Sequence, residues 1–299
     1  MAKHITKEIL RDHNLAPKKR FGQNFLIHSG TAQAIAQYGD ISDQDCVVEV
    51  GVGLGALTLH LARRAQKIIG IEVDSGLVRY HAEEQTLPPN VTLLHGDILR
   101  LDFKELVRQC GGPLKIVANL PYSISNPFIF KLIDNKEHLD WVIVMLQKEV
   151  AERLMASPST KEYGIPTVLL RGCATIEKLK RLGPQEFHPQ PKIDSLVIRL
   201  NFSQHWGKST RSPSFDYTFL SRVVRTAFAK RRKTLLNNLI NLQFSPSISD
   251  FQGNRQFLLE ALVEAGLAPG ERAENLTIED FIRLTTALEK RSAPEDKIS

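Results

Sequence analysis

The sequence predicts an α/β fold in which a mostly parallel sheet is covered by helices and followed by a smaller, all-helical C-terminal domain. Apolar runs of strand length alternate with segments of helical spacing over residues 46–156. A glycine-rich turn joins the first strand to the first helix. Beyond the polar, breaker-rich stretch at 203–214 no convincing strand follows, so we predict domains at residues 1–203 and 204–299.

The elements of the first domain follow from hydrophobic spacing. The expected strands are 46–50, 67–73, 91–94, 115–120 and 141–146, and the expected helices are 56–65, 75–84 and 149–156. Another helix is expected to begin at Asn126-Pro127, because Asn caps helices and Pro fits the first turn. Two further apolar runs, 168–173 and 196–202, predict two more strands.

The second domain has apolar residues at helical spacing throughout. Phe219 to Phe228 form one such segment, and Phe257 to Ala265 form a second that stops at Gly266. The run Thr277-Ile278-Glu279-Asp280 resembles a helix-capping arrangement before a third segment. We therefore expect this domain to be small and helical.

Composition excludes several classes of protein. The 299 residues are 42% hydrophobic and 24% charged, as in an ordinary globular chain and unlike a disordered chain or coiled-coil rod. No apolar run approaches the roughly 18 residues of a membrane-spanning helix. The net charge of +6 makes a polyanionic partner plausible without proving one.

The three cysteines are far apart in the sequence and form no Cys-x-x-Cys motif. A disulfide framework or a zinc site is therefore not expected, no metal is predicted, and a reducing compartment fits. The basic N-terminal segment lacks the apolar core of a secretion signal. We expect a cytoplasmic monomer.

Glycine and acidic residues gather at the carboxyl ends of the predicted strands. Gly51, Gly53 and Gly55 let the backbone turn tightly and let a ligand approach the main chain. Glu72 ends the next strand, where its carboxylate can accept hydrogen bonds from ribose hydroxyls, and Asp97 ends the third, where it can accept one from an adenine amino group. Gly51, Gly53 and Ala56 also satisfy the dinucleotide-binding pattern, with Ala in its last position, and a tight turn without ligand is a further alternative.

Asn119-Leu120-Pro121-Tyr122 follows the fourth strand and suits methylation of an exocyclic base amine. The lone pair of that nitrogen is delocalised into the ring. The side-chain oxygen of Asn119 and a backbone carbonyl can accept its two N–H bonds and stabilise the positive charge of attack. Pro121 holds Leu120 extended, which helps to aim its carbonyl, and Tyr122 can stack on the base. An Asn-Pro turn with a core Tyr is the alternative.

Two basic clusters are candidates for contact with phosphates. Six basic residues and no acid lie between Tyr217 and Ser249, and a shorter cluster lies near the N-terminus. A solvated helix face is the alternative interpretation of the first. The candidate RNA-binding residues are Lys18, Lys19, Arg20, Arg222, Arg225, Arg231, Arg232 and Lys233, with Lys230 in the same run.

From about Lys18 to Thr286 the chain resembles the small-subunit ribosomal RNA adenine N6,N6-dimethyltransferases, a family of class I S-adenosylmethionine-dependent enzymes. The pairing of Gln-Asn-Phe-Leu with Asn-Leu-Pro-Tyr is specific to this family and its antibiotic-resistance relatives. The matching segments are 19–26, 49–56, 71–74, 96–98, 119–122, 147–154, 163–164, 187–195, 231–235 and 272–276. The resemblance implies a Rossmann-like methyltransferase sheet with a helical RNA-binding domain. It also implies dimethylation of two adjacent adenosines near the 3′ end of 16S rRNA, within a pre-ribosomal particle.

Carried over residue by residue, the resemblance assigns roles. Cofactor contacts are expected from Asn24, Leu26, Gly51, Gly53, Gly55, Glu72, Asp97, Ile98 and Asn119, the cofactor being S-adenosyl-L-methionine. The catalytic set is Asn119, Leu120, Tyr122 and Phe187, the two aromatic rings holding the target base between them. Val52 stands where family members commonly have Pro, and Pro166 where Leu is common.

Three alternatives compete with this interpretation. One is an adenine methyltransferase of another nucleic acid, such as large-subunit rRNA or DNA. Another is an RNA-binding assembly or transcription factor with a vestigial cofactor pocket, which leaves Asn119 and Tyr122 without a purpose. The last is a nicotinamide-dependent oxidoreductase, which gives the Asn-Leu-Pro-Tyr run no role.

Overall fold

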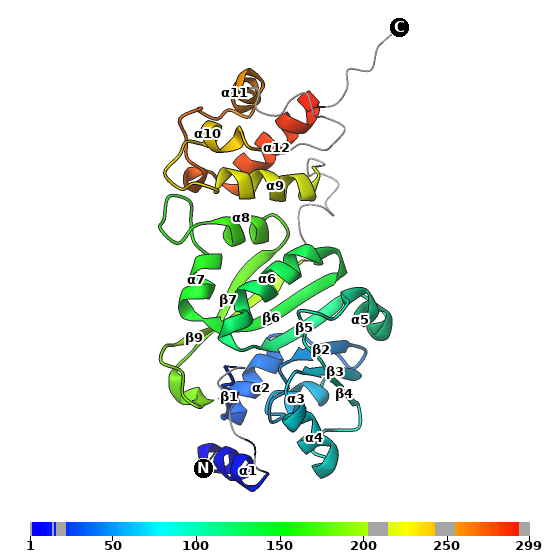
Figure 1. The fold of residues 1–299 in the computed structure, drawn as a ribbon. Coiled ribbons are helices and arrows are strands. Elements are labelled where there is room, and N and C mark those ends of the chain that lie inside the picture. Colours follow the sequence, from blue (N-terminus) through cyan, green and yellow to red (C-terminus); the bar gives the residue numbers. More distant parts are fainter. Residues whose placement is uncertain (1, 14, 16–21, 203–214, 243–254, 293–299) are drawn as a thin grey trace. The chain divides into compact units, whose positions relative to one another are not determined.

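The computed structural model describes residues 2–13, 15, 22–202, 215–242 and 255–292 (Figure 1). The chain divides into two compact units. The sheet unit comprises Met1–Ala151 and Ala174–Gln204, and the helical unit comprises Glu152–Cys173 and His205–Ser299.

A seven-stranded sheet forms the centre of the sheet unit, with the order β4-β3-β2-β5-β6-β9-β7. The first five strands in this order run parallel, whereas β9 is antiparallel to both of its neighbours. The strands are β2 (Cys46–Val50), β3 (Lys67–Glu72), β4 (Val91–His95), β5 (Leu114–Asn119), β6 (Leu139–Gln147), β7 (Thr175–Leu182) and β9 (Ser195–Asn201). The α/β class is confirmed.

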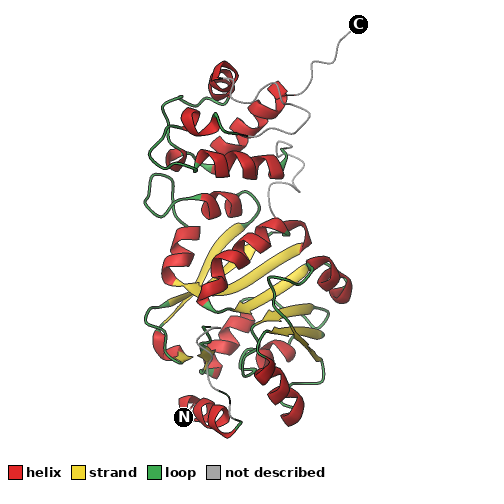
Figure 2. Ribbon diagram, viewed as in Figure 1, coloured by secondary structure: helices red, strands yellow, loops and turns green. Residues whose placement is uncertain are grey.

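Helices flank this sheet (Figure 2). They are α2 (Ser29–Gln37), α3 (Thr58–Ala62), α4 (Ser75–Glu84), α5 (Phe103–Cys110) and α6 (Ser125–Asp134). α7 (Lys148–Leu154) follows β6 directly, and α1 (Ala2–Asp12) contributes Leu10 to an apolar cluster with Phe25 and Leu77. Fully buried side chains of α2, α3 and the central strands share one apolar core. Because both faces of β2, β5 and β6 are covered, these strands are apolar nearly throughout, which made them predictable.

A two-stranded ribbon joins two distant motifs beside the main sheet. β1 (Phe25–Leu26) pairs antiparallel with β8 (Phe187–His188), with Leu26 opposite Phe187. Phe25, Leu26 and Phe187 are all buried. This pairing fixes the Gln-Asn-Phe-Leu segment next to the segment 187–195, although they are far apart in the sequence.

The helical unit contains α8 (Ile165–Arg171), α9 (Tyr217–Ala227), α10 (Leu235–Leu239), α11 (Arg255–Glu264) and α12 (Ile278–Ser292). Its described residues contain no strand, which agrees with the helical prediction for 204–299. The capping prediction is confirmed: Thr277 Oγ1 accepts from the Asp280 amide at 3.2 Å, while Asp280 accepts from the Thr277 amide at 2.8 Å.

Two sequence predictions were wrong in detail, and one strand of the main sheet was not predicted. Residues 168–173, expected to be a strand, lie mostly in α8, because a short buried apolar run does not distinguish strand from helix and Pro166 opens a helix. β7 was missed because its residues are largely charged and half exposed, as befits an edge strand. Helix α6 begins at Ser125 with Ile124 as N-cap, so Asn126 does not cap it.

The two units differ from the predicted domains 1–203 and 204–299, because residues 152–173 group with the helical unit. The Tyr163 hydroxyl donates to the Leu276 carbonyl at 2.7 Å, and the Tyr217 hydroxyl donates to the Leu169 carbonyl at 2.5 Å. These two hydrogen bonds hold α8 and the preceding Tyr163 within the helical unit. The predicted linker at 203–214 lies outside the described residues.

Within the described part of the chain, no helix has the length and apolarity needed to cross a bilayer.

Candidate functional site

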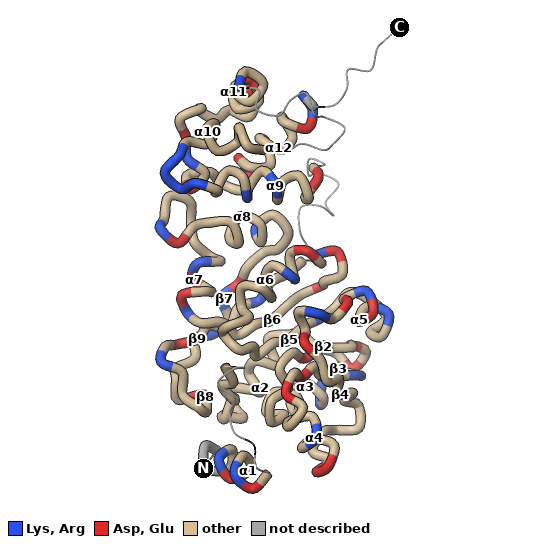
Figure 3. The backbone as a smooth tube through the Cα atoms, viewed as in Figure 1, with Lys and Arg blue, Asp and Glu red and all other residues tan. Residues whose placement is uncertain are grey.

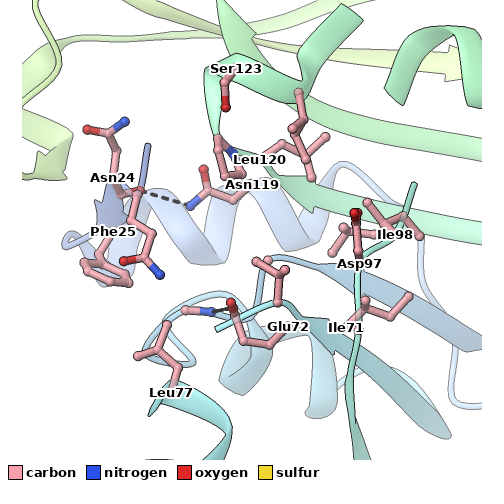
Figure 4. Close-up of a pocket in the computed structure, with 18 residues that line it drawn as sticks. Asn24, Phe25, Ile71, Glu72, Leu77, Asp97, Ile98, Asn119, Leu120 and Ser123 are labelled. Atoms are coloured by element: carbon pink, nitrogen blue, oxygen red, sulfur yellow. Dashed lines mark hydrogen bonds between the residues drawn. The ribbon is translucent and has the colours of Figure 1, made fainter. Parts of the chain in front are cut away.

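A cavity of about 190 Å³ opens at the carboxyl ends of the parallel strands, where ligands bind in open α/β sheets (Figure 4). Its walls come from β1, from the turn after β2, and from the ends of β3, β4 and β5. The lining residues are Gln23, Asn24, Phe25, Val50, Gly51, Gly53, Ile71, Glu72, Val73, Leu77, Gly96, Asp97, Ile98, Asn119, Leu120, Pro121, Ser123 and Ile124.

The glycine turn uses a backbone shape that other residues rarely adopt. Gly51, Gly53 and Gly55 have φ of 81°, 59° and 80°. A Cβ on Gly51 would lie 2.5 Å from the Asn119 carbonyl oxygen, and one on Gly53 would lie 3.1 Å from Phe25 Cδ1. The turn therefore packs directly against β5 and β1, and it exposes main chain to the cavity at Gly51 and Gly53.

Glu72, the last residue of β3, stabilises that turn. One carboxyl oxygen accepts from the Gly53 amide and the other from the Asp74 amide, both at 2.9 Å. Burial raises the pKa of Glu72, while these two amide donors lower it by stabilising the charged form. The carboxylate thus positions the loop, and its remaining lone pairs face the cavity that it lines.

A second carboxyl group, Glu49 on β2, is wholly buried just before the turn. Burial raises the pKa of Glu49 to about 8. The negative charge of Glu72 raises this pKa further, whereas the hydroxyl and the backbone amide of Thr58 lower it. Neither carboxyl oxygen has a hydrogen-bond partner among the described residues. Glu49 is therefore neutral in the folded protein over much of the physiological range.

Asn119 ends β5 and lies across the cavity from Glu72 (Figure 4). Its amide nitrogen donates to the Asn24 carbonyl at 3.4 Å, a long bond that turns Nδ2 toward β1. Asn24 in turn donates to the Gly22 carbonyl at 3.1 Å. No described residue bonds Asn119 Oδ1, so that oxygen is available to accept hydrogen bonds from a ligand.

The residues after Asn119 are also fixed. Leu120 and Pro121 line the cavity, but Tyr122 does not. The Tyr122 hydroxyl hydrogen-bonds Ser195 Oγ at 2.8 Å, and Ser195 is fully buried at the start of β9. Burial raises the pKa of Tyr122, opposed by this bond. The bond anchors a half-buried ring immediately beside the cavity.

Asp97 and Ile98 line the cavity after β4. Asp97 accepts from the Leu99 amide at 2.9 Å and lies 3.7 Å from Arg100 Nε. The amide bond fixes the turn, while the carboxylate stays half exposed toward the cavity. Ile98 is 3% exposed and presents an apolar wall suited to a flat ring.

The cavity therefore brings together Asn24, Gly51, Gly53, Glu72, Asp97, Ile98, Asn119 and Leu120 from the predicted site. Gly55 does not line it and instead completes the turn. Leu26 and Phe187 lie in the apolar core, with Phe187 only 1% exposed.

Sequence reasoning missed several residues that support the site. Phe25 is buried and also lines the cavity against Gly53. His81 of α4 is buried and places Nε2 2.8 Å from the Gly53 carbonyl, with Nδ1 on Thr86 Oγ1. Burial lowers the pKa of His81, which favours a neutral ring donating to that carbonyl. No local sequence signal marks a histidine that acts 28 residues away.

In the helical unit, the predicted basic residues lie on α9 and on the turn that follows it (Figure 3). The side chains of Arg225, Lys230, Arg231, Arg232 and Lys233 are exposed. Arg231 is held by Glu274 at 2.9 Å and by the Lys161 carbonyl at 3.1 Å. Arg222 is half-buried over the Phe219 ring. Lys18, Lys19 and Arg20 lie outside the described residues.

Comparison with known proteins places this site in a family. The sequence model described as ribosomal RNA adenine dimethylase matches residues 14–290. The chain belongs to this family. A ribosomal RNA small subunit methyltransferase A of Desulfotalea psychrophila is 51% identical over 286 residues, covering 95% of this chain and 96% of that protein. A protein of the same name from Bacillus cereus is 37% identical, covering 95% of each.

Solved structures show that the dimethylase fold extends beyond close relatives. A dimethyladenosine transferase from Plasmodium falciparum superposes with a TM-score of 0.71 at 24% identity, covering 88% of this chain and 97% of that chain. The 23S rRNA methyltransferase ErmE superposes with a TM-score of 0.64 at 22% identity, covering 89% and 100%. At these identities the likeness establishes the fold alone.

Proposed function

We propose that this dimethylase transfers methyl groups from S-adenosyl-L-methionine to N6 of two adjacent adenosines near the 3′ end of small-subunit (16S) rRNA, giving N6,N6-dimethyladenosine. The observation that carries the proposal is Asn119 in the wall of the cavity that the glycine turn also lines, with its amide nitrogen bonded to the Asn24 carbonyl and its oxygen available. The two relatives described above carry the name of a small-subunit rRNA methyltransferase.

The cavity residues fit the proposed cofactor. The Gly51 position leaves no room for a side chain, so a ligand there meets main chain. Glu72 offers carboxylate lone pairs for ribose hydroxyls, and Asp97 offers an acceptor for an adenine amino group beside the apolar Ile98. When bound, the cofactor supplies an electrophilic methyl group on a sulfonium. Asn24 and Asn119 are the residues we assign to that end of the cavity.

The chain's own contribution to the reaction is positioning and electrostatics. An adenine amine has two N–H donors, and the Asn119 Oδ1 and Leu120 carbonyl are the acceptors we assign to them. Accepting both bonds makes the nitrogen lone pair more available and stabilises positive charge as it forms. Holding that nitrogen in line with the methyl group supplies much of the remaining acceleration. No strongly basic side chain is needed.

Two aromatic residues are assigned to the target base. Tyr122 is anchored by Ser195 and half exposed, which suits a stacking platform. Phe187 is packed in the core, so its proposed stacking role requires β8 to move when the base enters. The target adenine must be unpaired or flipped out to reach the cavity.

The proposed RNA contacts are Arg222, Arg225, Arg231, Arg232 and Lys233 of the helical unit and Lys18, Lys19 and Arg20 near the N-terminus. Exposed cations of the α9–α10 turn support a role in phosphate binding. We assign cofactor binding and catalysis to the domain 1–203 and RNA binding to the domain 204–299. A ribosomal substrate implies a cytoplasmic protein, and we propose that it acts as a monomer on a pre-ribosomal particle.

The decisive experiment incubates the purified protein with methyl-labelled S-adenosylmethionine and small subunits that lack these methyl groups. The expected product is N6,N6-dimethyladenosine at two adjacent positions near the 3′ end, located by nuclease mapping and nucleoside mass spectrometry. Label on large-subunit rRNA or DNA would support the rival methyltransferase function. No transfer to any nucleic acid, with RNA binding intact, would support an assembly factor.

A further inference from the structure

Two cysteines that are 64 residues apart in the sequence come into contact in the sheet unit. Cys46 Sγ lies 2.7 Å from Cys110 Sγ. Cys46 is the first residue of β2, and Cys110 is the last residue of α5, directly before the left-handed Gly111. Both are free cysteines in half-buried positions. The sequence alone did not predict this contact.

The two cysteines and the cavity lie at opposite ends of the parallel strands. β2 and β5 run parallel, with Val47 paired to Lys115, so Cys46 is at the amino ends of these strands. The cavity opens at their carboxyl ends. Neither cysteine lines the cavity, and the proposed methyl transfer makes no use of either thiol.

The surroundings make one thiol the better nucleophile. The hydrogen bond between the two thiols is the main influence lowering the pKa of Cys46, and the nearby Lys67 charge also lowers it, whereas burial opposes both. The same contact with Cys46 raises the pKa of Cys110. Lys67 pairs with Cys46 across β2 and β3, and its Nζ donates to the Gln109 carbonyl at 3.4 Å.

We propose that Cys46 and Cys110 are a redox modification site, which forms an intramolecular disulfide when the protein meets a hydroperoxide. The Cys46 thiolate attacks one peroxide oxygen, the O–O bond breaks, and the sulfur becomes a sulfenic acid. The second oxygen leaves as hydroxide, or as the alkoxide of an organic peroxide, and takes up a proton to give water or the alcohol.

The Cys110 thiol then attacks the sulfenic sulfur. The S–S bond forms, the S–O bond breaks, and the hydroxyl leaves as water with the Cys110 proton. Two thiols have together lost two electrons and two protons, and one peroxide has been reduced. Only a pair in contact can complete this second step without unfolding.

The crosslink would close a loop that contains the glycine turn and the acidic residues of the cavity wall. Gly51, Gly53, Glu72, Asp97 and Ile98 all lie between Cys46 and Cys110. A disulfide across so long a loop restricts the unfolded chain strongly, so the oxidised protein should be the more stable form. The modification would therefore stabilise the cofactor-binding half under oxidative conditions without blocking the cavity.

The test treats the full-length protein with hydrogen peroxide under non-denaturing conditions and maps its peptides without reduction. We expect a linked peptide pair containing Cys46 and Cys110, loss of two of the three titratable thiols, and reversal by dithiothreitol. The melting temperature of the oxidised protein should rise by about 5 °C or more. A Cys173→Ser variant should behave in the same way, because Cys173 is a buried thiol of the helical unit.

In a Cys110→Ser variant the linked peptide must vanish, and the sulfenic acid on Cys46 should become trappable by dimedone. The proposal is overturned if the wild-type protein leaves both thiols unlinked at peroxide doses that oxidise Cys46. Crosslinks to Cys173 or between two chains, in place of the Cys46–Cys110 link, would overturn it equally.

Discussion

Gly51 occupies a backbone position that no larger residue fits. Its φ is 81°, and an added Cβ would meet the Asn119 carbonyl oxygen at 2.5 Å. We predict that Gly51→Ala lowers the free energy of unfolding by about 2–4 kcal/mol, from the left-handed backbone and the overpacking together. Because the glycine turn must shift, S-adenosylmethionine binding should weaken at least tenfold. Urea denaturation and titration calorimetry measure the two effects.

Gly30 in α2 provides the matched control. A Cβ there would meet no atom within 4 Å. Gly30→Ala should leave cofactor binding unchanged and leave stability unchanged or raise it by up to about 1 kcal/mol. If Gly51→Ala bound the cofactor as well as Gly30→Ala, the assigned role of the turn would be wrong.

The buried Glu49 carboxyl group makes stability depend on pH. Its pKa is about 8 in the folded protein, against an ordinary value of 4.5. Between these values the folded state keeps a proton that the unfolded state has lost. Stability from this group is therefore greatest below pH 4.5, falls as pH rises, and is lost above about pH 8.

Glu49→Gln keeps the shape of the side chain but removes its titration. We predict that the variant gains stability relative to wild type as pH rises from 5 to 8, on the order of a few kcal/mol at the upper end. Urea unfolding at several pH values measures the difference. Parallel pH profiles for the two proteins would show that Glu49 is ionised, and so exposed or paired, in the native state.

The functional residues most readily predicted from sequence are the polar residues at the carboxyl ends of strands. Glu72 and Asn119 are the last residues of β3 and β5, Asp97 follows the end of β4, and all three line the cavity. His81 and Ser195 act through contacts made only by the tertiary fold. Phe187 shows the opposite case: its motif was found in the sequence, but its burial depends on pairing with Leu26.

Among the elements, buried strands were predicted well, whereas edge and short elements were not. β5 and β6 are apolar because both faces are covered, and that pattern is visible in the sequence. β7 has one neighbour only, so charged side chains such as Lys178 and Lys180 interrupt its alternation. Residues 168–173 carry an apolar run that both a strand and a helix would explain.

Helix α12 depends on its capping residues. Thr277 and Asp280 exchange hydrogen bonds across its first turn. Thr277→Ala should lower the free energy of unfolding by about 1 kcal/mol. Thr218→Ala in the first turn of α9 is the control, since Asp216 supplies the cap there, and it should have little effect. Equal losses in thermal denaturation would argue against the reciprocal cap.

At the scale of the whole molecule, the excess of positive charge matters where it is exposed and unpaired. Lys230, Arg232 and Lys233 form no ion pair within the described ranges, unlike Arg231. We predict that replacing these three with Ala weakens binding to rRNA and reduces the slope of log K against log salt by about 2. Filter binding at several salt concentrations provides both quantities.

Lys104→Ala, which removes an exposed charge from α5 in the sheet unit, should leave the salt slope nearly unchanged. An unchanged salt slope in the triple variant would show that the RNA interface lies elsewhere on the protein. Cofactor binding should be the same in all these proteins, because none of the substituted residues lines the cavity.

The most direct test of the account measures single-turnover methyl transfer to unmethylated small subunits by Asn119→Ala beside wild type. The side-chain oxygen of Asn119 is the acceptor assigned to the target amine. The variant should fold and bind RNA as wild type does, yet transfer methyl groups about 10²–10³ times more slowly. Transfer at the wild-type rate, with the cofactor bound, would contradict the assigned chemistry.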